Sequence, residues 1–236
     1  MTWTTRPLCG FDLETTGVDP EVDRIVTAAV VLYDGRPARI STWVADPGVE
    51  IPAGAAAVHG YTTQAARSAG RPAAEVVAEV TEALVDASES GLPIVAMNAA
   101  FDLTMIDREA ERYGVKSVFG AAVPLVLDPK VLDKHVDRYR RGQRRLGDLC
   151  HRYAVVHGGA HNAAADAVAA CAVTVAIGEE YPWLATMPLE DLHEQQVRWA
   201  AHQQGGLRDY FASTPGKTHL AASVRTDWPL IPGWGQ

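Results

Sequence analysis

The sequence predicts an α/β fold in which helices flank a mixed five-stranded sheet, followed by a C-terminal extension. Two patterns along the chain predict it. Residues 7–44 hold three short apolar or β-branched segments with short links, which is typical of an antiparallel meander. From residue 72 onward, helical spacing of apolar residues alternates with short apolar runs, which is typical of helices between buried strands.

The first three strands make up the meander. We expect one over Pro7–Leu13, a short apolar run that enters an acidic turn. Arg24–Tyr33 is rich in β-branched residues and predicts the second strand. The dipeptide Asp34-Gly35 favours a hairpin turn, which places the third strand over Arg39–Val44.

The later elements alternate between helix and strand. Apolar residues recur at helical spacing in Pro72–Ala87, and Gly114 is a natural C-cap for a later helix. Strands that alternate with helices after a meander favour a mixed sheet. The other expected elements are the strands Leu92–Met97 and Val123–Leu127 and the helices Leu103–Tyr113, Gly142–Tyr153, Asn162–Glu180 and Leu189–His202.

A change of composition near Tyr181-Pro182 predicts the end of the main domain. Residues 214–236 are rich in Pro, Gly and Trp and show no periodicity. We therefore expect one domain over residues 1–182 and a C-terminal helix with an irregular tail over residues 183–236.

Charge and cysteine content exclude several classes of protein. The net charge of -8 argues against general nucleic-acid binding, so such contact needs metal ions or a local basic patch. Three scattered cysteines exclude a disulfide scaffold and a cysteine zinc site, which favours a reducing cytoplasm. We expect neither a signal peptide nor a membrane span, because the apolar stretches are too short.

Acidic residues follow two of the expected strands and begin a late helix. Asp12 and Glu14 are two apart on a strand, so they share a face at roughly 6.5–7 Å. Asp102 follows the middle strand, where an acid is often only a favourable first-turn residue. His161 and Asp166 flank the start of an Ala-rich helix whose small side chains permit a close approach to another surface.

Taken together, these residues resemble the DEDDh group of 3′–5′ exonucleases, which has a ribonuclease H-like fold. The matching segments are DLETTG at residues 12–17, VHGYT at 58–62, NAAFD at 98–102 and HNAAADA at 161–167. The VHGYT segment is most similar to the proofreading branch of bacterial DNA polymerase III. The signature positions carry over as Asp12, Glu14, Asp102, His161 and Asp166.

The resemblance implies a reaction with two Mg²⁺ or Mn²⁺ ions held by the four carboxylates. It implies that Asp12 bridges both ions, that Glu14 and Asp166 hold one and that Asp102 is near the other. His161 is then the general base, because an imidazole is partly neutral at neutral pH. Hard cations of this kind prefer oxygen ligands.

Further residues are candidates for substrate contact. The resemblance implies Thr15 beside the 3′-terminal nucleotide and Phe101 near the bases, although core packing explains Phe101 equally well. Asn98 and His59 are weaker candidates. The basic segment from Lys130 predicts phosphate contacts through Arg140, Arg141 and Arg144, against the alternative of a solvated charged surface.

A short segment near the C-terminus resembles peptides that bind DNA sliding clamps. Its spacing QxxLxxYF is carried by Gln204, Leu207, Tyr210 and Phe211. Such a segment binds a groove through a short apolar turn, which gives a polymerase or a clamp as the candidate partner. The simpler alternative is that these apolar residues pack back on the domain.

The sequence thus predicts a metal-dependent 3′–5′ exonuclease on single-stranded nucleic acid, with DNA favoured, in proofreading or DNA repair. An exoribonuclease acting on short RNA or RNA 3′ ends is the main alternative, separated by recognition of the 2′-hydroxyl. A non-catalytic polymerase-binding or clamp-binding module ranks lower because all five signature residues are present. A hydrolase of small phosphate esters would not need the basic segment.

Overall fold

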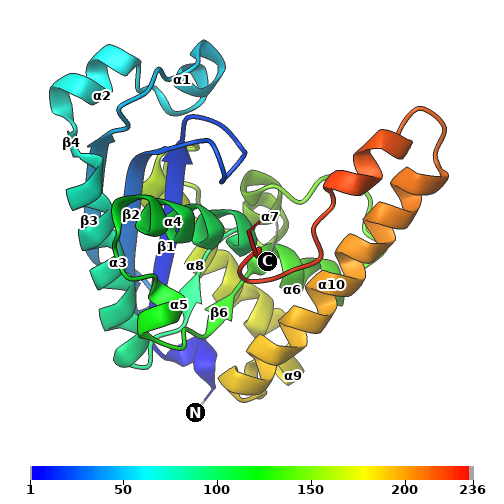
Figure 1. Cartoon of the computed structure of the whole chain (residues 1–236). Coiled ribbons are helices and arrows are strands. Elements are labelled where there is room, and N and C mark those ends of the chain that lie inside the picture. The colour runs from blue at the N-terminus through cyan, green and yellow to red at the C-terminus, as the bar shows by residue number, and fades with distance from the viewer. Residues whose placement is uncertain (1, 234–236) are drawn as a thin grey trace.

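The computed structural model describes residues 2–233 and contains a mixed six-stranded sheet (Figure 1). Strands β1, β2 and β3 form the predicted antiparallel meander, and β5 and β6 run parallel to β1. The five predicted strands are confirmed. The sixth, β4, has two residues and pairs parallel to the end of β3. In sheet order the strands are β4 (Arg71–Pro72), β3 (Pro37–Asp46), β2 (Ile25–Tyr33), β1 (Leu8–Thr15), β5 (Ile94–Val95) and β6 (Val126–Leu127).

The alternation of side chains along β1 explains its two roles. Cys9, Phe11 and Leu13 belong to the core cluster that also holds α3 (Ala73–Glu89) and α4 (Ala99–Tyr113) residues. The even-numbered residues, Asp12 and Glu14 among them, therefore face the opposite side of the sheet, which α8 (Ala163–Glu180) covers. Figure 1 shows these helices on the two faces. One strand thus supplies both core and site.

The other helices are shorter, apart from one. They are α1 (Ala53–His59), α2 (Thr63–Ala69), α5 (Val118–Ala121), α6 (Pro129–Val136), α7 (Leu146–Arg152), α9 (Pro182–Ala185) and the long α10 (Leu189–Ser213), with 3-10 turns at Trp3–Thr5 and Thr218–Ser223. In residues 2–233, no helix combines the length and the apolar content needed to cross a membrane.

Three helices differ from the predicted bounds. Helix α4 begins at Ala99, four residues early, because Asn98 in the left-handed region ends the preceding strand segment abruptly. Helix α7 begins at Leu146, four residues late, after a loop that holds Gly142 at positive φ. Helix α10 continues eleven residues past His202 through a Gly-Gly pair, supported by the Gln203 side chain, which donates to the Val131 carbonyl at 3.0 Å.

The chain beyond residue 182 packs on the same sheet. Gln196 of α10 is fully buried, accepts from the Asp128 backbone at 2.8 Å and donates to the Val126 carbonyl at 3.0 Å. Trp228 is also buried, and its indole donates to Asp128. Between these anchors, no side chain of residues 201–224 is fully buried. We call this projecting segment the C-terminal arm (Figure 1).

Candidate functional site

The candidate site begins where β1 meets the start of α4. The Leu13 backbone N–H donates to the Asp102 carboxylate at 3.1 Å, which ties the first turn of α4 to β1. Asp102 is 4% exposed. The start of α4 is itself fixed, because Asp128 accepts from the backbone N–H groups of Asn98 and Ala99 at 3.1 and 2.9 Å. Asp102 is therefore held beside Asp12 and Glu14 before any ligand binds.

Helix α8 begins next to the acids of β1, because the helix lies unusually close to that strand. A Cβ atom built on Gly10 would lie 2.8 Å from the Ala167 carbonyl oxygen and 2.8 Å from the Cys171 sulfur. The close approach predicted from the Ala-rich sequence is thus present, and Gly10 permits it. Asn162 caps the helix through its side chain, which accepts from the Ala165 N–H. The first turn then presents Asp166 toward β1.

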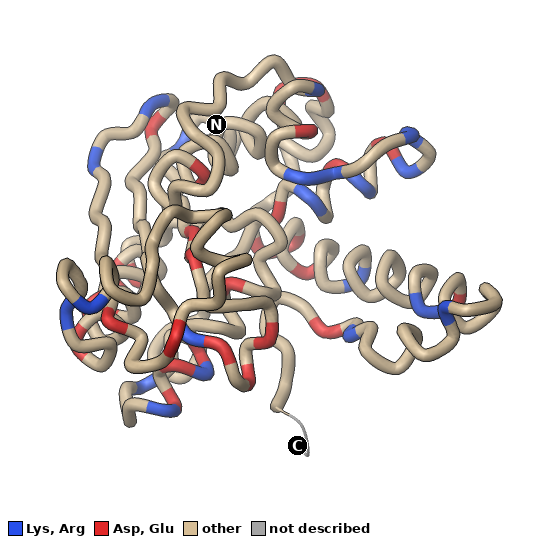
Figure 2. The backbone as a smooth tube through the Cα atoms, turned by 90° about the horizontal axis from the view of Figure 1, so that it is seen from above, with Lys and Arg blue, Asp and Glu red and all other residues tan. Residues whose placement is uncertain are grey.

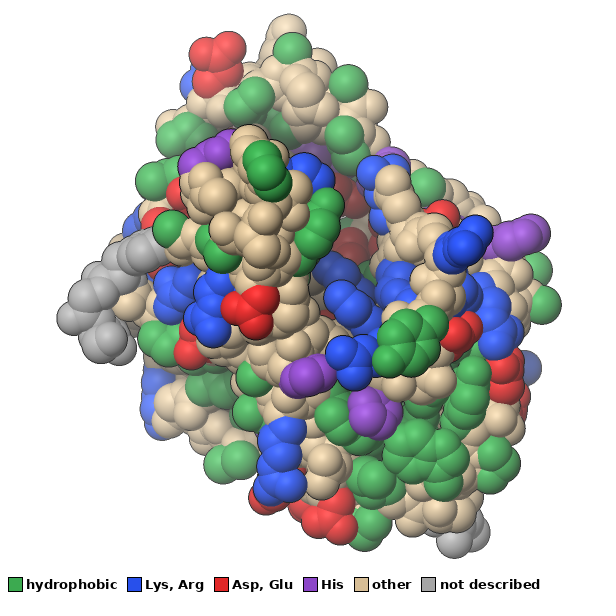
Figure 3. Space-filling model, turned by 90° about the vertical axis from the view of Figure 1, so that its right-hand side faces the viewer, with side chains coloured by type: hydrophobic (Ala, Val, Ile, Leu, Met, Phe, Trp, Pro, Cys, Tyr) green, Lys and Arg blue, Asp and Glu red, His purple; other side chains and the backbone are tan. Residues whose placement is uncertain are grey.

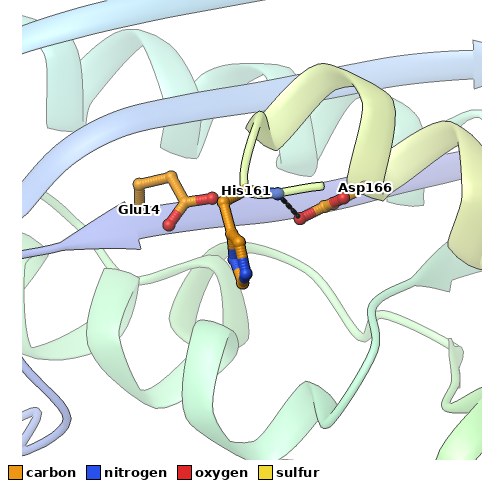
Figure 4. Close-up of side chains that lie close together, drawn as sticks. All are labelled: Glu14, His161 and Asp166. Carbon is orange, nitrogen blue, oxygen red and sulfur yellow. Dashed lines mark hydrogen bonds between the residues drawn. The ribbon is translucent and has the colours of Figure 1, made fainter. Parts of the chain in front are cut away.

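Glu14, His161 and Asp166 meet at this junction (Figure 4). Their potential ligand atoms all lie within 4.8 Å of one another. His161 has a positive φ of 62°, and its backbone N–H donates to the Asp166 carboxylate at 3.1 Å. This unusual backbone turns the imidazole of His161 to the side of Glu14, where a reacting water could lie.

Burial and mutual repulsion dominate the electrostatics of the acids. The pKa of Asp12 is raised well above its usual range, first by burial and then by the carboxylates of Asp102, Asp166 and Glu14. Burial, with repulsion from Asp166, raises the pKa of Glu14 to about 7. Burial also raises the pKa of Asp102. Every neighbouring charge that acts on Asp12 in the described chain is negative, so the cluster favours a bound cation.

The donor set fits hard divalent cations. Carboxylate oxygens are the ligands that suit Mg²⁺ and Mn²⁺. A cysteine site is excluded here, because Cys9 and Cys171 are buried and burial raises the pKa of both thiols. The arrangement can thus hold divalent ions beside an exposed imidazole.

Comparison with known proteins gives a family for this arrangement. Residues 9–174 match the RNase T exonuclease family, which covers every residue of the site described above. The chain belongs to this exonuclease family. The match ends before α9, α10 and the C-terminal arm. A search of curated proteins finds no match.

Solved structures with a similar fold include exonuclease I proteins. One, described as suggesting how processivity is achieved, is 20% identical with a TM-score of 0.64 over 75% of this chain. Exonuclease I from Methylocaldum szegediense is 24% identical with a TM-score of 0.61 over 75% of this chain. This exonuclease covers only 42% and 41% of those two chains. The likeness therefore shows the fold alone.

The exonuclease site contains a second histidine that the sequence reasoning missed. His157 Nε2 lies 2.5 Å from one oxygen of Asp166, while the other oxygen accepts from the His161 backbone. Both Asp166 oxygens are thus oriented by the loop before α8. The available signal was the spacing of two histidines in HGGAH, but the loop has no periodicity that would indicate where His157 points.

The candidate substrate residues lie on two sides of the acids. Thr15 ends β1, and its hydroxyl donates to the Gly17 carbonyl at 2.6 Å. His59 lines a groove of about 140 Å³ together with Glu14 and His161, and its Nε2 is buried with no hydrogen-bond partner. Asn98 and Phe101 line a groove of about 530 Å³ on the other side. Of these residues, His59 thus shares a groove with Glu14, whereas Asn98 and Phe101 line a separate groove next to the start of α4.

The basic segment of the exonuclease has a different arrangement from the predicted one. Arg140 donates to the fully buried Asp133 at 2.7 Å, and Arg144 donates to the same carboxylate. Tyr153 donates to its other oxygen at 2.9 Å. Arg140 and Arg144 thus neutralise a buried acid, and their contact with phosphates stays a prediction. Arg141, by contrast, is exposed.

The predicted clamp-binding segment lies inside α10 and is not a separate turn. Gln204, Leu207 and Phe211 line the 530 Å³ groove, and Tyr210 lines another groove of about 600 Å³ that Leu207 also borders. The rings of Tyr210 and Phe211 lie 5.7 Å apart. The segment is thus part of one continuous helix, which corrects the expectation of a separate single turn.

Proposed function

We propose that this protein is a metal-dependent 3′–5′ exonuclease that hydrolyses phosphodiester bonds of single-stranded nucleic acid, with DNA favoured. The observation that carries the proposal is the meeting of Asp12, Glu14, Asp102 and Asp166 at one end of β1, beside His161, in a chain of the exonuclease family. The raised pKa of Asp12 supports a cluster that functions with bound cations.

Each residue has a proposed role. The four carboxylates of Asp12, Glu14, Asp102 and Asp166 would hold two Mg²⁺ or Mn²⁺ ions. When bound, such ions lower the pKa of water and neutralise charge that develops on phosphate. His161 would accept the proton of the attacking water, since it is exposed and lies within reach of the Glu14 and Asp166 side chains. Thr15 and His59 would contact the 3′-terminal nucleotide.

The preference for DNA draws support from related structures. E. coli exonuclease I has been solved with dT13 and with dA16, so that protein binds single-stranded DNA. For this chain, the same class of ligand is a proposal. Its three cysteines are free and buried, which is compatible with the reducing cytoplasm that we propose as its location.

The test is a degradation assay that compares DNA with RNA. Pure protein is incubated with 5′-labelled single-stranded DNA, and separately with RNA of the same sequence, in Mg²⁺, Mn²⁺ or EDTA. We expect a ladder that shortens from the 3′ end with metal present, and none from the Asp166→Ala variant. Robust digestion in EDTA would contradict the metal role. Faster cleavage of RNA would replace the DNA preference with the exoribonuclease alternative.

A polymerase or sliding clamp stays a predicted partner. The segment Gln204–Phe211 is accessible on the C-terminal arm, but its side chains are divided between two grooves. Binding of the full chain to purified clamp tests the prediction, and no binding at high micromolar protein would end it.

A further inference from the structure

The proposed mechanism leaves unused a groove between α4 and the C-terminal arm. One wall carries Asn98 and Phe101, four residues and one residue before Asp102. The opposite wall carries Gln204, Leu207 and Phe211 of α10. Its volume of about 530 Å³ lies within the range of about 300–1,000 Å³ that is typical of ligand sites.

The wall of the groove that the C-terminal arm supplies is formed by one face of α10. Gln204, Leu207 and Phe211 are three and four residues apart, so they share one face of α10. Leu207 is 37% exposed, so its side chain is accessible on the groove side. These residues lie outside the match to the exonuclease family, which ends at residue 174. Membership of the family therefore assigns no role to this wall.

A second groove of about 450 Å³ meets the first one at Asn98. Asn98 lines both grooves, and its side chain accepts from the Lys130 ammonium at 2.8 Å. Arg144 and Arg145 line the second groove on its far side. They belong to residues 137–145, which we call the basic loop. Figure 2 shows that the basic loop and the arm project from the same side of the molecule.

Charge differs sharply between the two grooves. The groove at the arm is lined largely by apolar side chains, with the acids Asp19, Glu21 and Asp227 and one base, Arg225, which pairs with Asp227 at 3.6 Å. The groove at the basic loop has Lys130, Arg144 and Arg145 and contains no acid among its lining residues in the described chain. Figure 3 shows Lys and Arg side chains around a hollow with acidic side chains inside it. A strand of nucleic acid also has two chemically different sides, with anionic phosphates on one and apolar base faces on the other. The phosphates would suit the basic groove and the bases would suit the apolar groove.

We propose that the C-terminal arm is the second wall of the substrate groove and contacts the nucleotides on the 5′ side of the scissile phosphate. The bases lie between Phe101 and the pair Leu207 and Phe211, while the phosphates face Lys130 and Arg145. The acids at the edge of the arm groove keep the phosphate backbone on the basic side. The proposal rests on the exonuclease function proposed above and adds a determinant of substrate length.

The groove also selects for single strands. Bases can enter the space between Phe101 and Leu207 only when they are unpaired, because a paired base carries its partner strand with it. Stacking and apolar contact with bases do not depend on sequence, since every base has an aromatic face. The arm therefore favours single-stranded substrates of several nucleotides without selecting a base.

The experiment compares substrates of increasing length in a double variant and a control. Leu207→Ala/Phe211→Ala removes the apolar arm wall, and Tyr210→Ala is the matched control, because Tyr210 does not line this groove but lines the neighbouring one of about 600 Å³. Substrates are the nitrophenyl ester of thymidine monophosphate and oligothymidylates of two to twelve nucleotides. For the wild type and the control, kcat/KM should increase with length and then level off.

In the double variant, kcat/KM should fall about tenfold or more on the longer oligomers and stay unchanged on the nitrophenyl ester. The same length dependence in double variant and wild type would overturn the proposal. So would unchanged length dependence together with lost binding to a sliding clamp, which would assign the arm to a protein partner.

A binding measurement separates this proposal from the exonuclease function itself. Fluorescence anisotropy with labelled dT12 in Ca²⁺ needs no cleavage, so it tests the groove even if the wild type is inactive on every substrate. We expect the double variant to bind at least about fivefold more weakly than Tyr210→Ala. Equal affinities of the two variants would overturn the proposal, whatever the catalytic assay shows.

Discussion

The carboxylates and the histidines of the candidate site are held in opposite ways. Asp102 is buried and tied to the Leu13 backbone, and Asp12 has a pKa raised by burial and by three other acids. His161 is exposed, with a positive φ, in the loop before α8. Fixed acids suit cations that must hold their positions, whereas an exposed imidazole can exchange a proton with solvent. Mutation of the acids and mutation of the histidines should therefore change activity in different ways.

The largest expected effect comes from the buried acids. Asp12→Asn should lower kcat by about 10³-fold or more, because it removes a ligand whose cations supply several kcal/mol to the transition state. The same variant should have a higher Tm than the wild type in EDTA, since it removes one repelling charge from the cluster. Steady-state kinetics and scanning fluorimetry measure the pair of effects. A variant that is both inactive and less stable in EDTA would contradict the electrostatic explanation.

Variants of His161 and His157 should distinguish loss of proton transfer from loss of metal affinity. His161→Ala should lower kcat by about 10²–10⁴-fold at every metal concentration, as expected for loss of a general base. His157→Ala should instead raise the Mn²⁺ concentration required for half-maximal activity by about 10–100-fold, because His157 orients Asp166. Saturating Mn²⁺ should restore much of its kcat. His151→Ala, on the exposed side of α7, is the control.

If His157→Ala lost kcat without any change in its Mn²⁺ requirement, His157 would belong with the proton-transfer group. The acids and the histidines would then no longer differ in the way proposed at the start of this comparison.

Gly10 connects the two regions, because it sets the distance between β1 and α8. Gly10→Ala places a Cβ 2.8 Å from the Ala167 carbonyl and the Cys171 sulfur, so α8 must shift. Overpacking of this kind costs about 1–3 kcal/mol of stability, and a displacement near 1 Å costs about 10²-fold in rate. Gly54→Ala is the matched control, since a Cβ there has no neighbour within 4 Å. Wild-type activity in Gly10→Ala would show that the site tolerates movement of α8.

The sequence predicted the acids better than it predicted their surroundings. Asp12, Glu14 and Asp166 occur at spacings that local geometry fixes, because a strand alternates faces and a helix turn follows its cap. The five main strands were predicted on the same basis. The two-residue strand β4 was missed, because it exists only through its pairing with β3.

Contacts between distant segments account for the other differences. Nothing in the spacing of Arg140 and Arg144 indicates that Asp133 would be buried beneath them, eleven residues from Arg144. Likewise, α10 continues through a Gly-Gly pair that would end many helices, since Gln196 and Gln203 hold it to the strand end and to α6. Burial and side-chain partners depend on the whole fold, and a single sequence does not display them.

The smallest predicted effect is a pH dependence of stability that depends on Glu14. Its pKa is raised to about 7 by burial and by Asp166, whereas an unfolded glutamate titrates near 4.5. The folded metal-free protein therefore binds this proton more tightly than the unfolded chain. Its stabilising contribution should be fully present below pH 4.5 and should be lost as the pH rises through about 7, the reverse of a salt-bridged carboxylate.

Other groups titrate in the same interval with the opposite sign, so the test must isolate Glu14. Burial lowers the pKa of His59, which costs stability as the pH falls. The difference in Tm between the wild type and Glu14→Gln, measured in EDTA from pH 8.5 to 5, cancels such contributions.

Glu14→Gln should be the more stable protein at pH 8.5, and its advantage in Tm should shrink toward pH 5. Saturating Mn²⁺ should abolish or reverse that advantage at pH 8.5, because the ionised carboxylate then has a cation beside it. A constant difference across the pH range would mean that Glu14 is as well solvated as an ordinary surface acid. The contrast with the exposed His161 would then hold only for Asp12 and Asp102.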